Sequence, residues 1–189
     1  SQRRISLLVN QGQTFMLLLM MPEYYDLLTH YESMARELGN PELLGAFYAR
    51  LGDCEYWFGE FDRTIQTLTK AVELCEAAGS AEEAARAHLR LEWSHFMRGD
   101  FYRALALKEE FIRIMDQRSS LRWHPYVLTI ASRAYACLGR WEEAVEEAQK
   151  AVSIAEDLSD NSLISWSAWN LSIAYSWKGD SAQAIEYGE

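Results

Sequence analysis

The stretch that decides the fold is Gly139-Arg140-Trp141-Glu142-Glu143-Ala144. Related stretches stand at steps of forty residues on either side of it: GEFDRT at 59–64, GDFYRA at 99–104 and GDSAQA at 179–184. A motif that returns at a fixed period of this length is typical of repeat proteins. Each glycine lies between two segments with helical apolar spacing, so each motif is predicted to be a turn between two helices.

A second series of residues marks the end of each unit. Gly39, Gly79, Ser119 and Ser159 are also forty residues apart, and glycine there suits the left-handed residue that ends a helix. The sequence therefore predicts an all-α protein of antiparallel helix pairs, in about five repeats with the last one truncated. The approximate limits of the repeats are 1–39, 40–79, 80–119, 120–159 and 160–189.

Two places depart from the regular pattern. In the first unit, Leu19 and Met20 stand where later units have glycine and an acidic or basic residue. We expect one helix from Ile5 to Leu18, followed by a second helix that starts near Pro22. In the fourth unit, Pro125 should begin the well-formed helix, so residues 121–124 are predicted to be extended or a short turn.

These units resemble the tetratricopeptide repeat. The resemblance implies a right-handed superhelical solenoid that forms a single domain over residues 1–189. Units of forty residues exceed the family's 34, as in the expanded repeats of bacterial regulators that carry such arrays behind ATPase, cyclase or DNA-binding domains. HEAT and armadillo repeats, with a similar period, rank second. The matching residues are Leu51, Gly52, Gly59, Phe61 and Ala71; Gly99, Phe101 and Ala104; Tyr135, Gly139, Trp141, Ala144 and Ala151; and Tyr175, Gly179 and Ala184.

In the family, the first helix of each unit lines the concave face of the array. The resemblance therefore implies a partner-binding groove, and its positions hold five of the seven tryptophans together with several arginines. The implied groove residues are Arg50, Asp53, Trp57, Arg86, Arg90, Trp93, Met97, Tyr126, Thr129, Arg133, Trp166, Trp169, Asn170, Ile173 and Trp177.

The residue types on this face suggest what the groove would bind. Arginine binds carboxylates with two hydrogen bonds, and tryptophan and tyrosine are common interface anchors, so we expect a protein or peptide partner, with acidic groups as candidate contacts. The family's carboxylate clamp uses a lysine that is missing at these positions. Two alternatives stay open: the tryptophans pack against neighbouring helices, or Arg86 and Arg90 form surface ion pairs with Glu82 and Glu83.

Composition narrows the choice of partners and compartment. The net charge of −10 is unsuited to binding a phosphate backbone, so we expect no nucleic acid. The apolar run Leu17–Met21 is far too short to span a membrane, and no signal peptide is visible. Cys54, Cys75 and Cys137 lie in apolar helical patterns and are predicted to be buried thiols, which is typical of a cytoplasmic protein.

No sequence motif points to a reaction. The four histidines lack metal-ligand spacing, and neither a phosphate-binding glycine loop nor an activated nucleophile is present. We therefore expect no enzyme activity, cofactor or metal. The acidic run Glu142, Glu143, Glu146 and Glu147 is predicted to be a solvated outer face.

Three functions remain open at this stage. The first is a protein-interaction scaffold that binds its partner in the groove. The second is a regulatory, sensor or oligomerisation domain of a larger signalling ATPase, nucleotide cyclase or transcription regulator. A helical-array enzyme ranks last. The chain has no initiator methionine and stops within a repeat, so we expect a fragment of a longer protein that self-associates through its exposed terminal repeat.

Overall fold

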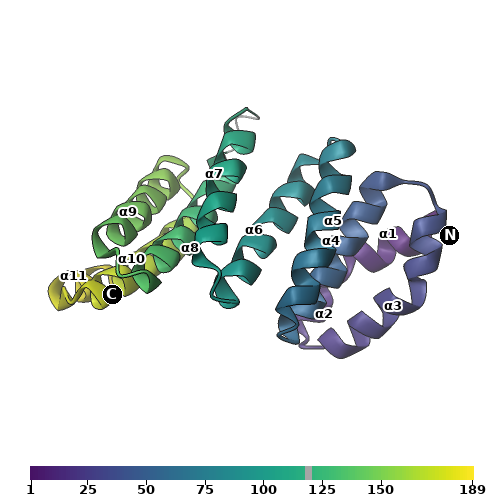
Figure 1. The fold of residues 1–189 in the computed structure, drawn as a ribbon, viewed down its shortest axis with the longest axis horizontal. Helices are drawn as coiled ribbons and strands as arrows, with labels where there is room; N and C mark the ends of the chain where they lie inside the picture. The colour runs from purple at the N-terminus through teal and green to yellow at the C-terminus, as the bar shows by residue number, and fades with distance from the viewer. Residues whose placement is uncertain (118–120) are drawn as a thin grey trace. The chain divides into compact units, whose positions relative to one another are not determined.

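The protein is described by a computed structural model that covers residues 1–117 and 121–189, so the predicted turn residue Ser119 lies outside the described residues. Within these two ranges the chain contains helices and turns but no strand, which confirms the all-α prediction. The chain forms two compact units, Ser1–Ser94 and His95–Glu189 (Figure 1). That the repeats form one continuous domain stays a prediction.

Unit 1 is built from consecutive helices that pair as the repeat period predicts. Helix α4 packs along α5, and α3 packs on α4. At the start of α4, the Asn40 side chain accepts a hydrogen bond of 3.0 Å from the backbone N–H of Leu43, as an N-cap should. The helices are α1 (Gln2–Asn10), α2 (Gly12–Leu17), α3 (Met21–Glu37), α4 (Pro41–Trp57), α5 (Phe61–Ala77) and most of α6 (Ala81–Met97).

Unit 2 repeats the arrangement, with α9 packed on both α8 and α10. The predicted short turn before Pro125 is a 3-10 helix, η1, which confirms that prediction. The elements are α7 (Phe101–Gln117), η1 (Leu121–Trp123), α8 (His124–Cys137), α9 (Trp141–Asp157), α10 (Asn161–Lys178) and α11 (Ser181–Gly188).

The predicted first helix, from Ile5 to Leu18, is wrong: it is two helices, α1 and α2, separated at Gln11. Gly12 follows the break and is buried against the long side chain of Arg50. A Cβ atom on Gly12 would lie 2.7 Å from Cδ of Arg50, so a larger residue would have to displace that side chain. Glycine is also a weak helix former, which favours the break at this point.

One backbone conformation recurs at steps of twenty or forty residues. Six glycines, from Gly39 to Gly179, have φ between 62° and 89°. Leu19 and Ser159 adopt the same left-handed conformation, with φ of 57° and 53°, although their side chains disfavour it. The repeat therefore imposes its backbone geometry even where the glycine has been replaced.

Replacing Ser159 with glycine should raise the free energy of unfolding by about 0.5–1 kcal/mol. Glycine removes the strain of a left-handed residue, and this gain exceeds its larger loss of chain entropy on folding. Urea denaturation followed by circular dichroism measures the change. The reverse substitution, Gly139→Ala, places a side chain in the same strained conformation and should lower stability. A stabilising Gly139→Ala change would contradict the prediction.

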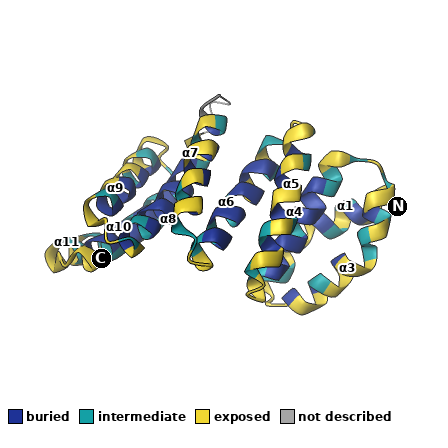
Figure 2. Cartoon of the chain, in the orientation of Figure 1, coloured by how far each residue is buried: buried dark blue, intermediate teal, exposed yellow. Residues whose placement is uncertain are grey.

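Small residues allow the paired helices to approach closely. Gly45 and Gly52 on α4 lie against α5, where an added Cβ would be 2.6 Å from Sγ of Cys75 and 2.5 Å from Cδ2 of Leu68. In unit 2 the two positions that correspond to Gly52 are serines: Ser132 donates to the carbonyl of Ala144 at 2.7 Å, and Ser172 to that of Ala184 at 2.6 Å. Buried residues consequently line the helix faces that meet (Figure 2).

Candidate functional site

The predicted groove residues of unit 1 lie on α4 and α6, where Arg90 and Asp53 bind each other and Arg50 binds residues outside the groove. Arg90 on α6 forms an ion pair of 2.8 Å with Asp53 on α4, and its guanidinium lies 4.5 Å from the ring centroid of Tyr56. Arg50 donates to the carbonyl of Val9 at 3.3 Å and to the Glu83 carboxylate at 3.1 Å. These two arginines therefore join helices within the unit.

The remaining groove residues of unit 1 are more accessible. Trp57 is 51% exposed at the end of α4, and Trp93 on α6 is half-buried. The Arg86 side chain is 46% exposed, and its ion-pair contacts with Glu82 and Glu83 are long, at 3.7 and 3.9 Å. Such exposed pairs contribute little to stability, so they do not explain why arginine occupies this position.

Unit 2 contains a continuous group of aromatic rings, which we call the aromatic cluster: Trp123, Tyr126, Trp166 and Trp169. The ring centroids of Trp123 and Tyr126 are 6.0 Å apart, those of Tyr126 and Trp166 are 6.1 Å apart, and those of Trp166 and Trp169 are 5.4 Å apart. The cluster joins η1 and α8 to α10 and ends at Trp169, which is 50% exposed. Trp123 is absent from the predicted groove because it precedes the helix whose spacing defined that groove.

Buried polar groups hold the aromatic cluster in place. The indole N–H of Trp166 donates to the Thr129 hydroxyl at 3.2 Å. Asn170, only 2% exposed, accepts from Nε of Arg133 at 2.9 Å and donates to the carbonyl of Trp166 at 2.8 Å. The Arg133 guanidinium lies 5.3 Å from the ring centroid of Trp169. The rings of Trp166 and Trp169 thus each have a polar side chain beside them, Thr129 and Arg133 respectively.

Arg133 is poorly placed to bind a carboxylate. Burial lowers the pKa of its guanidinium, and Asn170 already occupies its Nε donor. It nevertheless stays charged, since an arginine pKa begins far above neutrality. The exposed surface of the cluster is thus mainly aromatic. The predicted groove residue Trp177, near the end of α10, is 44% exposed and adds another indole surface.

The arrangement of polar residues elsewhere suggests structural roles. Burial is the main influence on the pKa of His95, which is lowered even though Nδ1 lies 3.1 Å from the Asp100 carboxylate. His88 lies 3.2 Å from the Glu76 carboxylate. In the part of the chain that the structure describes, no three histidine, cysteine or acidic side chains come together as metal ligands.

Two predictions about polar residues need correction. Glu147 does not lie on a solvated face: it is buried and forms ion pairs with Lys108 at 3.2 Å and Lys150 at 2.9 Å. Lys108 on α7 reaches this part of α9, which helical spacing alone does not reveal. Cys137, at the last residue of α8, is exposed rather than buried.

The other two thiols are buried, as predicted. Burial raises the pKa of Cys54 to about 12 and that of Cys75 to about 11, so neither is a reactive thiolate at neutral pH.

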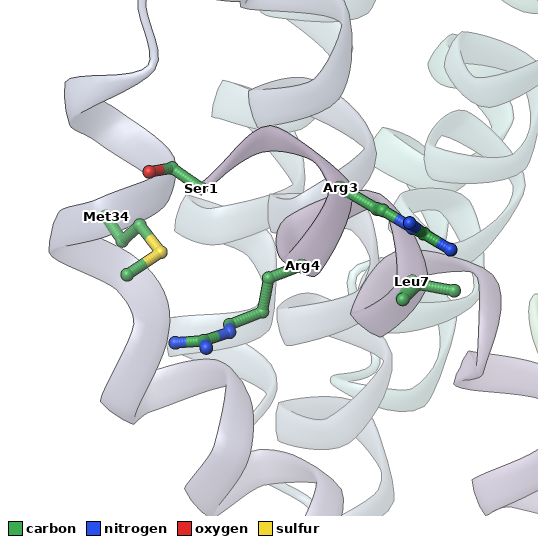
Figure 3. Close-up of a pocket in the computed structure, with 5 residues that line it drawn as sticks. All are labelled: Ser1, Arg3, Arg4, Leu7 and Met34. Carbon is green, nitrogen blue, oxygen red and sulfur yellow. The ribbon is translucent and has the colours of Figure 1, made fainter.

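A hollow at the N-terminal end of unit 1 is lined by Ser1, Arg3, Arg4, Leu7 and Met34. Figure 3 shows that Arg4 extends toward α3, on the side of Met34, whereas Arg3 and Leu7 point away from it. The Arg4 guanidinium lies 5.6 Å from the Tyr31 ring centroid. The lining groups diverge, so the hollow does not present convergent polar groups to a ligand.

None of the helices in the described ranges is both long and apolar enough to cross a membrane.

Comparisons with known proteins agree on the fold. Residues 128–189 match the model of the tetratricopeptide repeat. Tetratricopeptide-like repeats of a Podosopora anserina protein described as a kinesin light chain superpose with a TM-score of 0.75 at 18% identity, over 97% of this chain and 91% of that one. A comparison with curated protein sequences found no match.

Two further similar structures are of longer proteins. A Rap protein in complex with competence and sporulation factor has a TM-score of 0.82 at 12% identity, over 97% of this chain and 51% of that one. Aspartyl phosphate phosphatase F from Bacillus subtilis has a TM-score of 0.78 at 11% identity, over 98% of this chain and 58% of that one. The chain is therefore an all-α protein with a tetratricopeptide-repeat-like fold, whose consecutively packed helix pairs include a match to the family model at residues 128–189.

Proposed function

We propose that the chain is a non-catalytic protein-interaction module that binds a peptide or protein through the inner face of its helix pairs. The observation that supports this most strongly is the aromatic cluster. Trp169 is half exposed at the end of four rings in contact, and the neighbouring Trp166 ring is held by a hydrogen bond from its indole N–H to Thr129. Rigid, partly exposed tryptophans are the residue type most enriched among interface anchors.

The aromatic rings, rather than the arginines, would supply most of the binding energy. Arg90, Arg50 and Arg133 already bind Asp53, Glu83 and Asn170. A partner carboxylate would have to displace these groups, which reduces the net gain from each new ion pair. Arg86, the most exposed of the predicted groove arginines, is the best candidate for an acidic contact.

A displayed random-peptide library selected against the chain tests this proposal. Peptides enriched on the parent protein should bind the variant Trp169→Ala at least about tenfold more weakly, because truncating a central interface anchor commonly removes about 2 kcal/mol or more. Trp141→Ala is the matched control, since Trp141 is also partly exposed in unit 2 but lies on α9. Fluorescence anisotropy measures the affinities. Equal binding to parent, variant and control would reject the cluster as the binding site.

The second candidate is a regulatory or sensor domain within a larger signalling protein. The structural likeness to a Rap protein bound to a peptide factor favours it, and this chain corresponds to about half of that protein. The sequence on either side of residues 1–189 would separate the two candidates: an adjoining ATPase, cyclase or DNA-binding domain supports regulation, and its absence supports a free-standing scaffold.

The proposal includes a cytoplasmic location and self-association of the chain. Free thiols at Cys54, Cys75 and Cys137 accord with a cytoplasmic location, where disulfides are rare. Self-association through the last helices, where Trp177 and Ile185 are 44% and 61% exposed, stays a prediction.

A further inference from the structure

A second surface, in unit 1, exposes large apolar side chains, of which only Trp57 also belongs to the predicted groove. We call it the apolar edge. Its residues lie at the ends of α2 and α4 and in the turns that follow these helices, and none is less than 38% exposed. Apolar residues scattered singly on a surface need no explanation, but a group of this kind commonly marks an interaction site. The apolar edge consists of Leu17, Leu18, Leu19, Met20, Trp57 and Phe58.

Contacts between aromatic rings place the two turns together. The Phe58 ring, just after α4, packs edge-on against Tyr25 of α3 with centroids 5.4 Å apart. Phe15 of α2 stacks on Tyr24 at 4.6 Å, and the carbonyl of Phe15 accepts from the N–H of Met20 at 2.9 Å. The beginning of α3 therefore contacts both turns, which lie at the same end of unit 1 (Figure 1).

Leu19 is unusual within this edge. It adopts the left-handed conformation that glycine takes in most units, and its side chain is 77% exposed. Leu19 therefore costs free energy in two ways. Its backbone is strained, and its apolar side chain is exposed to water. Strained residues commonly cluster at functional positions, and a partner that covers Leu19 would offset the second of these penalties.

The charges around the edge discriminate between possible occupants. Exposed acidic residues lie at the beginnings of the adjoining helices: Glu23 and Asp26 on α3, and Glu60 and Asp62 beside α5. The nearby cation Arg63 forms ion pairs with Glu55 and Glu60. A second copy of the chain or an anionic membrane would bring negative charge against this rim, which is unfavourable.

We propose that the apolar edge binds a basic amphipathic helix of a partner protein. The apolar face of that helix would cover the leucines and Trp57, and its lysines or arginines would face the acidic rim. One apolar face flanked by charge is the pattern of helices that bind apolar surfaces. This interaction uses unit 1 alone and does not depend on the aromatic cluster, so each surface can be tested separately.

Two model peptides provide the probe. They share one helical pattern of leucines and differ only in their flanking residues, lysine in one and glutamate in the other. The lysine peptide should bind the parent chain at least about tenfold more tightly than the glutamate peptide, and added salt should weaken it. Fluorescence anisotropy of the labelled peptides gives the affinities.

The decisive variant is Leu18→Ser with Leu19→Gly. Both side chains are exposed, and glycine suits the left-handed position, so circular dichroism should show an intact fold. The variant should lose at least about tenfold in affinity for the lysine peptide. The matched control Tyr102→Ser changes a side chain in unit 2 that is 73% exposed and should bind as the parent does.

Four results would overturn the proposal: no measurable binding of the lysine peptide, equal binding of the two peptides, equal binding by parent and variant, or equal losses in variant and control. Sedimentation and vesicle co-flotation distinguish the other occupants. A dimer of the parent that the variant fails to form would assign the edge to a second copy. Binding of the parent, but not the variant, to phosphatidylserine vesicles would assign it to a membrane.

Discussion

The substitution Gly45→Ala is expected to lower the free energy of unfolding by about 2 kcal/mol, opposite in sign to its usual effect. Within an exposed helix, alanine in place of glycine stabilises by about 1 kcal/mol. At Gly45 the new Cβ would lie 2.6 Å from Sγ of Cys75 and 3.1 Å from the backbone nitrogen of the same residue. The backbone of α5 cannot shift at one residue unless the whole helix moves. The new methyl group would therefore push α4 and α5 apart.

Gly52→Ala is the matched control for this prediction. Its Cβ would meet only side-chain atoms of Leu68, the nearest at 2.5 Å, and a leucine side chain can change rotamer. We therefore expect a smaller loss for Gly52→Ala than for Gly45→Ala. Urea denaturation of both variants measures the difference. If Gly45→Ala proves stabilising, the close approach of α4 and α5 is incorrect.

Replacing Lys108 with methionine should destabilise unit 2 by about 3 kcal/mol, because Glu147 would lose a buried partner. Both side chains are buried, and Nζ of Lys108 lies 3.2 Å from Glu147. Burial alone would lower the pKa of Lys108, but hydrogen bonding and charge from Glu109 and Glu147 raise it, so the lysine stays protonated. The remaining contact of Glu147, with Lys150, involves a side chain that is 57% exposed.

The double variant Lys108→Met with Glu147→Leu tests the cause of this loss. It leaves no buried unpaired charge, since the former partners Glu109 and Lys150 are exposed, so most of the stability should return. Glu143→Ala removes an exposed ion pair with Arg140 on the same helix and should leave the denaturation midpoint unchanged. A double variant as unstable as Lys108→Met alone would point to lost packing rather than to an unpaired carboxylate.

The helical architecture follows from the sequence because its signals are local. The glycine period marks the turns, and Asn40 and Pro125 mark helix starts that the structure places at or next to these residues. The pattern holds even at Leu19, whose backbone keeps the geometry of the glycines. Such features depend on the conformational preferences of a few neighbouring residues.

Other features depend on distant residues and were not predictable in the same way. The break before Gly12 accommodates Arg50, which comes from another helix. Glu147 is buried because Lys108 on α7 reaches it, and Cys137 is exposed although its surroundings in sequence are apolar. The predicted groove positions do bring Tyr126, Trp166 and Trp169 together in unit 2, but whether they bind a partner stays a prediction.

The polar bonds beneath the aromatic cluster carry a kinetic consequence. Trp166 donates to Thr129, and Arg133, which binds Asn170, lies over the ring of Trp169, so both rings have polar neighbours that restrict their rotation. A ligand that binds at Trp169 would then have fewer side chains to order. Association should accordingly proceed without a slow rearrangement, and substitutions in the cluster should alter mainly how long a complex lasts.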